Sequence, residues 1–415
     1  MTTFIHYGPS TYARSGHGWE NTPVVPDSIN PSRWDPGQWA RVAREVGFKG
    51  LIFVAKHHNG FALWPTETSE FDIALTPFKN GEGDMVADVS EAVRAEGLAF
   101  GVYLSPWDKH APTYGTDAYN DVYQAQLREL LTGYGPVFEF WIDAARGEGV
   151  PFDFIRFDEA VRLAWSLQPD VMVGLLGPPP DFRWGGNEHG VGEETTWMRR
   201  PGYWQPPECD FPLRRNWFWA PTDDGQVLTV DELVDAYFTT QGRSCQFLLG
   251  LSPDTRGLIP EADVQRLRGF RARLDAIFAT DLAAYQPTSA SDLRDGAAGW
   301  AGRQATDPRP GTFWATNDGT TTASLTVDFD EPRSFTVVEL REPIAHGQRI
   351  ARHRVDAWDG AGWVPVVSAT TVGYRRLHRT ERTTTTRVRL VVEEALAPPA
   401  LSQFSLYDAD GIVPD

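Results

Sequence analysis

Short apolar runs alternate with helical patterns along residues 1–280, and this alternation limits the fold more than any other feature. Continuous apolar runs separated by helices are typical of parallel strands that are buried on both faces. We therefore expect a (β/α)8-like, TIM-type barrel, with a doubly wound open sheet as the alternative. The expected strands are 3–8, 50–55, 98–105, 137–141, 171–177 and 245–252. The expected helices are 36–47, 85–97, 119–135, 157–170, 229–242 and 260–280.

The sequence changes character twice after this pattern is established. Residues 178–227 are rich in Pro, Gly and Trp, and we expect them to be irregular. After about residue 285, segments such as ASLTVDFD, SFTVVELRE, HRVDAWDG, GWVPVVSATTVG and TRVRLVVEEA are short and bounded by turn residues. That pattern predicts an all-β sandwich. We therefore expect a barrel domain over 1–284 and a sandwich domain over 285–415.

The charge balance excludes some partners. The net charge is −18, from 38 basic and 56 acidic residues, so nucleic acid and anionic membranes would be repelled. No apolar run is long enough to span a bilayer. The start, MTTFIHYGPS, lacks the features of a signal peptide, which predicts a cytoplasmic protein, or a secreted one if a leader was removed. The sequence does not determine the oligomeric state.

No pattern of metal ligands is evident. Cys209 and Cys245 could form one disulfide, but they do not form a metal-binding pair. His57 and His58 are adjacent, and neighbours on a strand point to opposite faces, so they would chelate one ion poorly. We therefore expect no metal, and expect the histidines to bind hydroxyl groups instead.

Polar and aromatic residues collect where four successive strands end. His6 follows the first run, Lys56 to Gly60 follow the second, Tyr103 precedes the end of the third, and Asp143 follows the fourth. In a barrel these positions share the C-terminal face, where catalytic groups gather. A single aspartate at a strand end is ordinarily a cap or turn residue. The coincidence at four strand ends favours an active site.

Five stretches resemble the α-L-fucosidases of glycoside hydrolase family 29. They are KHHNGFALWPTETSEFD, GDMVADVSEAVRAEGLAFGVYLSPWDKHAPTYG, YNDVYQAQLRELLTGYGPVFEFWIDAARGEG, PDFRWGGNEHGVGEETTW and PPECDFPLRRNWFWAP. The resemblance covers about residues 4–280 and is closest to the branch that acts on α-1,3/1,4-linked fucose in Lewis-type glycans. It implies a barrel with a C-terminal sandwich, and a cofactor-free hydrolase of fucosylated oligosaccharides that retains configuration.

The resemblance also assigns expected roles to residues. Asp143 in FWID matches the family's nucleophile, and Glu188 in RWGGNE matches the acid/base of this branch. Retention requires the two carboxyls to lie close together, and the acid to begin protonated. Glu208 in PPECD is the rival acid/base, but resembles a contact to the galactose of a branched substrate. The residues expected to hold fucose are His6, His57, His58, Tyr103 and Trp141, with Trp217 as an aromatic wall.

Three positions depart from the family's usual pattern. Asn59 replaces an aspartate, Ala144 replaces a glycine directly after the nucleophile, and CQFLLG replaces GNLLLN. Glycine tolerates backbone conformations that alanine does not, so Ala144 raises a question about the loop. Two alternatives therefore stay open: a glycan-binding relative with impaired catalysis, and a barrel glycosidase for another sugar. The segment GQRIARHRVDAWDGAGW resembles discoidin-like sandwiches, which either bind glycans or support the barrel.

Overall fold

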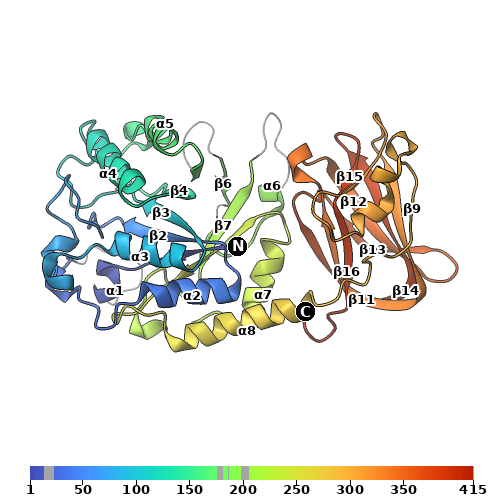
Figure 1. Cartoon of the computed structure of the whole chain (residues 1–415), viewed down its shortest axis with the longest axis horizontal. Helices are drawn as coiled ribbons and strands as arrows, with labels where there is room; N and C mark the ends of the chain where they lie inside the picture. The colour runs from blue at the N-terminus through green and yellow to red at the C-terminus, as the bar shows by residue number, and fades with distance from the viewer. Residues whose placement is uncertain (14–22, 175–180, 186, 198–204, 415) are drawn as a thin grey trace. The chain divides into compact units, whose positions relative to one another are not determined.

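The computed structural model describes residues 1–13, 23–174, 181–185, 187–197 and 205–414. Its first part is a sheet of eight parallel strands that curls into a nearly closed barrel (Figure 1). The predicted barrel is therefore confirmed. Its strands are β1 (Thr2–Ile5), β2 (Gly50–Lys56), β3 (Ala99–Leu104), β4 (Glu139–Ile142), β5 (Met172–Gly174), β6 (Arg183–Trp184), β7 (Pro207–Pro212) and β8 (Gln246–Leu251).

The strand order follows from the chain order, as in a closed barrel. Neighbours run β5-β4-β3-β2-β1-β8-β7-β6, so β1 pairs with both β2 and β8. A parallel bridge from Gly174 to Phe182 joins the two ends of this row. The C-terminal ends of the strands consequently surround one common space.

Helices follow most of the strands. They are α2 (Pro36–Val46), α3 (Met85–Ala95), α4 (Tyr119–Gly133), α5 (Phe157–Leu167), α7 (Val230–Thr239) and α8 (Glu261–Ile277), with short α1 (Pro9–Ala13) and α6 (Glu194–Trp197). Helix α2 shows why such helices begin and end where they do. The Asp35 side chain accepts a hydrogen bond from the Gln38 backbone N–H, Pro36 occupies the first turn, and Gly47 ends the helix with φ 92°.

The described part of residues 178–227 contains two strands, β6 and β7. The prediction of an irregular segment was therefore wrong for the six residues of β7. Proline at both ends of β7 and two carboxylates inside it, at Glu208 and Asp210, hid the apolar signature of a buried strand. Both carboxylates are themselves buried, and such groups are rare inside proteins.

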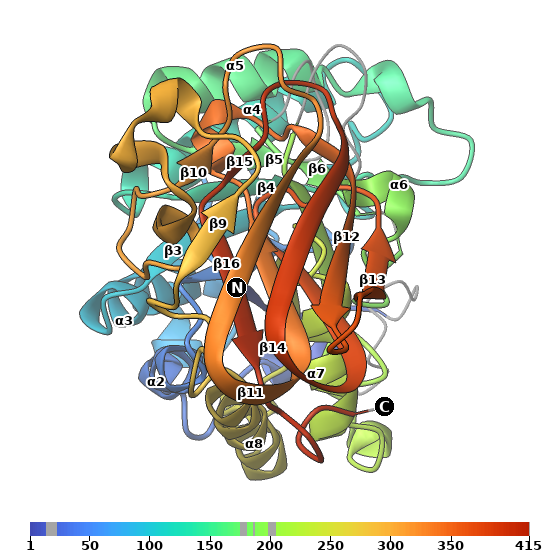
Figure 2. The same ribbon diagram turned by 90° about the vertical axis from the view of Figure 1, so that its right-hand side faces the viewer.

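The C-terminal part is the predicted antiparallel β domain (Figure 2). Its main sheet has the order β13-β12-β14-β11-β16, and β9 adds to β11. The segments predicted as separate strands at 323–330 and 334–342 form one long strand, β11, whose register shifts between Asp328 and Arg333. The strands are β9 (Thr288–Ala290), β10 (Trp314–Ala315), β11 (Ala323–Arg341), β12 (Ile350–Trp358), β13 (Trp363–Ala369), β14 (Arg376–Ala395), β15 (Ala400–Leu401) and β16 (Gln403–Tyr407).

The chain divides into two compact units. The first contains residues 1–189, 205–229 and 246–271, and so includes all eight barrel strands. The second contains residues 230–245 and 272–415 together with the segment that begins at Gly190, and so includes α6, α7 and the β domain. The boundary expected near residue 284 stays a prediction. Within the described ranges, no helix has both the length and the apolar character needed to cross a membrane.

Candidate active site

Side chains alternate between the two faces of β4, and the residues on one face extend from the barrel interior to the site. Successive strand residues point to opposite faces, so Glu139, Trp141 and the following Asp143 share one face. Trp141 belongs to a buried cluster with Phe4 and Tyr103, and its ring lies 5.0 Å from that of Phe4. The cluster forms the floor of the site, and Asp143 lies one step above it.

A pocket of about 270 Å³ lies over this floor. Every residue predicted for the site lines the pocket except Glu208. The strand-end residues predicted from the sequence are therefore brought together in one place. The lining is Phe4, His6, His57, His58, Tyr103, Trp141, Asp143, Ala144, Ala145, Trp184, Glu188, Asp210 and Trp217.

Both carboxylate oxygens of Asp143 are held in place. The Tyr103 hydroxyl donates to Oδ2 at 2.6 Å, and the Ala145 backbone N–H donates to Oδ1 at 2.6 Å. The Nε2 atom of His58 lies 3.9 Å from Oδ2. Burial raises the pKa of Asp143, while the bonds from Tyr103 and the backbone oppose that rise because they favour the charged form.

Two of the three departures, at Ala144 and Asn59, have simple structural explanations. Ala144 does not adopt a positive φ, so the loop after Asp143 does not need glycine there. The Oδ1 atom of Asn59 accepts a hydrogen bond from the Phe61 N–H at 2.9 Å, which closes a tight turn. An aspartate would accept the same bond, so the asparagine preserves the backbone of this loop.

Glu188 enters the pocket from a strained turn. Its φ is 51°, an uncommon value for a residue other than glycine. The Trp217 Nε1–H donates to Glu188 Oε2 at 3.4 Å. Burial and the nearby Asp143 carboxylate raise the pKa of Glu188, and the bond from Trp217 opposes that rise. Strain of this kind is concentrated at functional sites.

The histidine pair corrects one expectation. His57 and His58 were expected to point to opposite faces, but β2 ends at Lys56 and their ring centres lie 3.9 Å apart. Both rings line the pocket because the extended alternation stops before them. The Nδ1 atom of His58 is 2.8 Å from the Ser105 hydroxyl, and burial lowers the pKa of His58 to about 3. His58 is therefore neutral at physiological pH.

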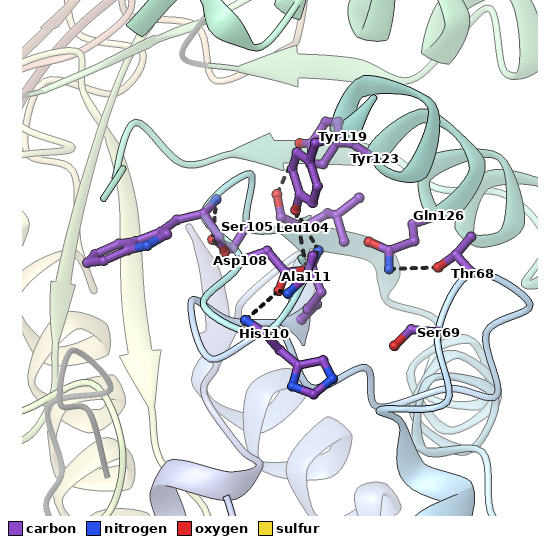
Figure 3. Close-up of polar contacts among 12 residues, drawn as sticks. Thr68, Ser69, Leu104, Ser105, Asp108, His110, Ala111, Tyr119, Tyr123 and Gln126 are labelled. Carbon is purple, nitrogen blue, oxygen red and sulfur yellow. Dashed lines mark hydrogen bonds and ion pairs between the residues drawn. The ribbon is translucent and has the colours of Figure 1, made fainter. Parts of the chain in front are cut away.

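The loop after β3 is anchored by a buried ion pair. Lys56 Nζ donates to Asp108 Oδ2 at 2.9 Å and to the Tyr119 hydroxyl at 3.0 Å. Figure 3 shows Asp108 Oδ1 accepting from the backbone N–H groups of His110 and Ala111, at 3.0 and 2.8 Å. In the same loop, the Trp107 ring stacks on His58 with ring centres 5.0 Å apart. The pair thus fixes one wall of the histidine cluster.

Two acids of β7 lie at different depths of the barrel. Glu208 is buried beneath the pocket, where the Trp141 Nε1–H donates to its Oε1 at 2.9 Å. Burial raises the pKa of Glu208 to about 8, and the neighbouring Glu139 carboxyl also has a raised pKa. The galactose contact expected of Glu208 stays a prediction.

Asp210 is the acid that the sequence interpretation missed. It lines the pocket and accepts a hydrogen bond from the Trp184 Nε1–H at 2.5 Å. Burial raises its pKa to about 7, and the Glu188 carboxylate adds to the rise. The signal was available, because residues two apart on a strand share a face and Asp210 is nearer the strand's C-terminal end than Glu208.

Within the described ranges, no three His, Cys, Asp or Glu side chains are grouped so that they could hold a metal ion. Cys209 and Cys245 are both buried, and they do not form the disulfide that their number would allow. The pocket therefore offers carboxyl, imidazole, phenol and indole groups. The carboxyl groups of Asp143 and Glu188 line the same pocket, as general acid/base and nucleophilic chemistry at the end of a barrel requires.

Comparisons with known proteins agree with this geometry. The α-L-fucosidase family model matches residues 2–275, and the F5/8 type C domain model matches residues 287–401. Alpha-L-fucosidase 1 of Arabidopsis thaliana is 35% identical, over 98% of this chain and 85% of its own. A Ruminococcus gnavus GH29 fucosidase solved in complex with fucose is 28% identical, with a TM-score of 0.91, and the match covers 100% of this chain and 94% of that one.

Proposed function

The chain belongs to the α-L-fucosidase family of glycoside hydrolases, and from this premise we propose that it is a retaining exo-α-L-fucosidase. One observation carries the mechanism: Asp143 has both oxygens fixed by hydrogen bonds in a pocket that also contains Glu188. Two carboxyl groups in one pocket are what a double displacement at a sugar's anomeric carbon requires.

Asp143 is the proposed nucleophile. Attack on the anomeric carbon needs an ionised carboxylate, and the bonds from Tyr103 and Ala145 favour that form. They also fix the direction of the oxygens, which reduces the entropy lost on reaching the transition state. The covalent bond forms from Asp143 to the sugar as the bond to the leaving-group oxygen breaks.

Glu188 is the proposed acid and then base. Its raised pKa favours the protonated form, which can donate its proton to the departing oxygen. Once Asp143 is esterified, its negative charge is gone and one cause of the raised pKa disappears. The pKa of Glu188 then falls, so the carboxylate that remains after proton donation stays ionised and can accept a proton from the incoming water.

The rest of the pocket suits a single deoxy sugar. The buried Nδ1 atom of His6 has no hydrogen-bond partner among the described residues, and His58 is neutral, so both rings can exchange hydrogen bonds with hydroxyl groups. Phe4 and Trp217 add apolar surface for the methyl group of fucose. The buried cluster beneath the pocket blocks passage of a longer chain, which favours action at a chain end.

We further propose that the linkage is α-1,3 or α-1,4, as in Lewis-type glycans. The motif RWGGNE, which carries Glu188, supports this branch of the family. Trp184 and Asp210 lie in the same pocket lining as the proposed acid, where a leaving-group sugar would need polar partners. Release of fucose from Lewis a and Lewis x trisaccharides should exceed release from α-1,2- and α-1,6-linked disaccharides. A preference for either disaccharide would contradict the linkage.

The mechanism is tested by separate variants of the two carboxyls. Asp143→Ala should lower kcat by several orders of magnitude, and Glu188→Ala should regain turnover when azide is added with an aryl fucoside. The first-formed anomer, followed by NMR, should keep the α configuration. Glu208→Gln is the matched control, because it should show no rescue by azide. Rescue of Glu208→Gln in place of Glu188→Ala would exchange the two assignments.

A further inference from the structure

A second hollow lies within the second compact unit. Its volume is about 470 Å³, and its walls come from α6, β12, the end of β13 and both ends of β14. A space of this size falls in the range of small-molecule sites and exceeds what one inorganic ion needs. Its lining is Glu194, Trp197, Arg352, His353, Ser368, Ala369, Thr370, Arg376 and Glu393.

Two side chains of this hollow have buried donors that meet no acceptor among the described residues. Arg376 is 9% exposed and Trp197 is 7% exposed. The Nε and Nη1 atoms of Arg376 and the Nε1 atom of Trp197 have no hydrogen-bond partner within the described residues. Buried donors are nearly always paired, so three unpaired donors on two adjacent side chains need an explanation.

Two guanidinium groups lie close to the Trp197 ring. The guanidinium groups of Arg376 and Arg243 lie 4.9 and 5.0 Å from the centre of the Trp197 ring. Arg243 also donates a hydrogen bond to the Gly192 carbonyl at 2.8 Å. Burial lowers the pKa of Arg376 to about 10, and repulsion by the nearby Arg243 cation adds to this decrease.

The acids of the lining do not neutralise Arg376. Glu393 forms ion pairs with Arg352 and Arg354, at 3.2 and 2.7 Å. Glu194 attracts Arg376 electrostatically, yet in the part of the chain that the structure describes the two are not joined by an ion pair within 4 Å. Arg376 therefore keeps a charge that no carboxylate of this lining contacts.

The histidines beside the hollow do not add positive charge. His353 Nε2 lies 2.9 Å from His378 Nε2, so one of these nitrogens must be an unprotonated acceptor. His353 Nδ1 lies 2.6 Å from the Thr370 carbonyl, which requires a proton on that nitrogen. Burial lowers the pKa of His353 to about 4 and holds that of His378 well below its usual value. Of the two arginines in the lining, Arg352 is paired with Glu393, and Arg376 is the one for which the described residues supply no ion pair.

We propose that this hollow binds the carboxylate of an acidic sugar. A carboxylate accepts several hydrogen bonds and matches a guanidinium in plane, so it would satisfy Arg376 and the indole N–H of Trp197 together. The remaining volume admits a sugar ring, and the Ser368 and Thr370 residues at its wall offer polar groups for ring hydroxyls. The site belongs to a different unit from the Asp143 pocket and does not depend on the proposed hydrolysis.

The test compares D-glucuronic acid, D-glucose and sodium sulfate at constant ionic strength, by titration calorimetry or ligand-observed NMR. Glucuronic acid should bind the full chain at least about tenfold more tightly than glucose, because a hydrogen bond to a charged group is worth that much or more. Arg376→Met should lose at least about tenfold in affinity. Arg387→Met is the matched control, with unchanged binding expected, because Arg387 is on the same strand and lies 5.3 Å from the Trp363 ring but is outside the hollow.

Three results would overturn the proposal: equal binding of glucose and glucuronic acid, binding of sulfate alone, or full affinity in Arg376→Met. If Arg376→Met fails to fold, Arg376→Lys decides, because it keeps the charge but cannot make the paired contact. It should bind glucuronic acid more weakly than the unmodified chain and still more tightly than glucose. Glucuronic acid, unlike glucose, should also raise the melting temperature of the unmodified chain, which a purely structural role for Arg376 would not produce.

Discussion

Replacing Lys56 by methionine should destabilise the barrel strongly, although Lys56 lies outside the active-site pocket. The Lys56 side chain is 0% exposed and its partner Asp108 is 4% exposed. Methionine has nearly the same length, so the change leaves the packing but removes the charge that Asp108 faces. Removing one partner of a buried pair costs about 3–5 kcal/mol, because the remaining charge is left without a partner.

That free energy converts to a measurable shift in melting temperature. For a domain of this size a change of 1 kcal/mol moves Tm by roughly 2 °C, so Lys56→Met should lower Tm by roughly 6–10 °C. Differential scanning fluorimetry would measure the shift. Arg162→Met is the control, because Arg162 and Asp158 form an exposed pair on α5, 63% and 45% accessible. Its Tm should stay within about 1 °C of the unmodified chain.

A double variant separates charge from packing. Asp108 uses Oδ2 for Lys56 and Oδ1 for the backbone of His110 and Ala111. Asparagine keeps an oxygen for the backbone bonds and has no charge, so Asp108→Asn should recover part of the loss in Lys56→Met. The reasoning fails if Lys56→Met costs no more than Arg162→Met, or if the double variant is no more stable than Lys56→Met.

Two further predictions concern the pocket. The hydrogen bond from Trp217 lowers the pKa of Glu188, so Trp217→Phe should raise that pKa. The alkaline limb of the kcat/KM profile should then move to higher pH. An alkaline limb at the same or a lower pH would contradict the contact. A Cβ at Gly250 would lie 2.7 Å from the Trp217 ring, so Gly250→Ala should displace that wall and raise KM for an aryl fucoside. Gly133→Ala, which meets nothing within 4 Å, should leave KM unchanged, and equal values for both variants would refute the clash.

Much of the barrel could be predicted because its strands carry a strong local signal. The strand from Gly50 to Lys56 is fully buried and is therefore a nearly continuous apolar run, which can be recognised from its composition alone. Strand β7 was missed because Glu208 and Asp210 are polar residues placed in the interior, and only their partners make that placement tolerable. Trp141 and Trp184 supply those hydrogen bonds from other strands, which no local pattern records.

The gathering of the strand-end residues in one pocket could be predicted from the same local signal. Strand-end residues such as His6 and Asp143 could be placed because parallel strands all end on one face. The contact of His57 with His58 could not, because it depends on the residue at which β2 stops. The positive φ of Glu188 could not be predicted either, because the residue at that position is not a glycine.

The shared face of Glu139, Trp141 and Asp143 has a consequence for how such enzymes can diversify. Strand β4 carries a buried acid and an aromatic floor residue, and the proposed nucleophile comes directly after it, so the three stand at intervals of two residues. An insertion or deletion in β4 would exchange all three at once for residues of the opposite face. The segments after the strands can change length without this exchange, so the packing that holds the barrel together also fixes where Asp143 lies.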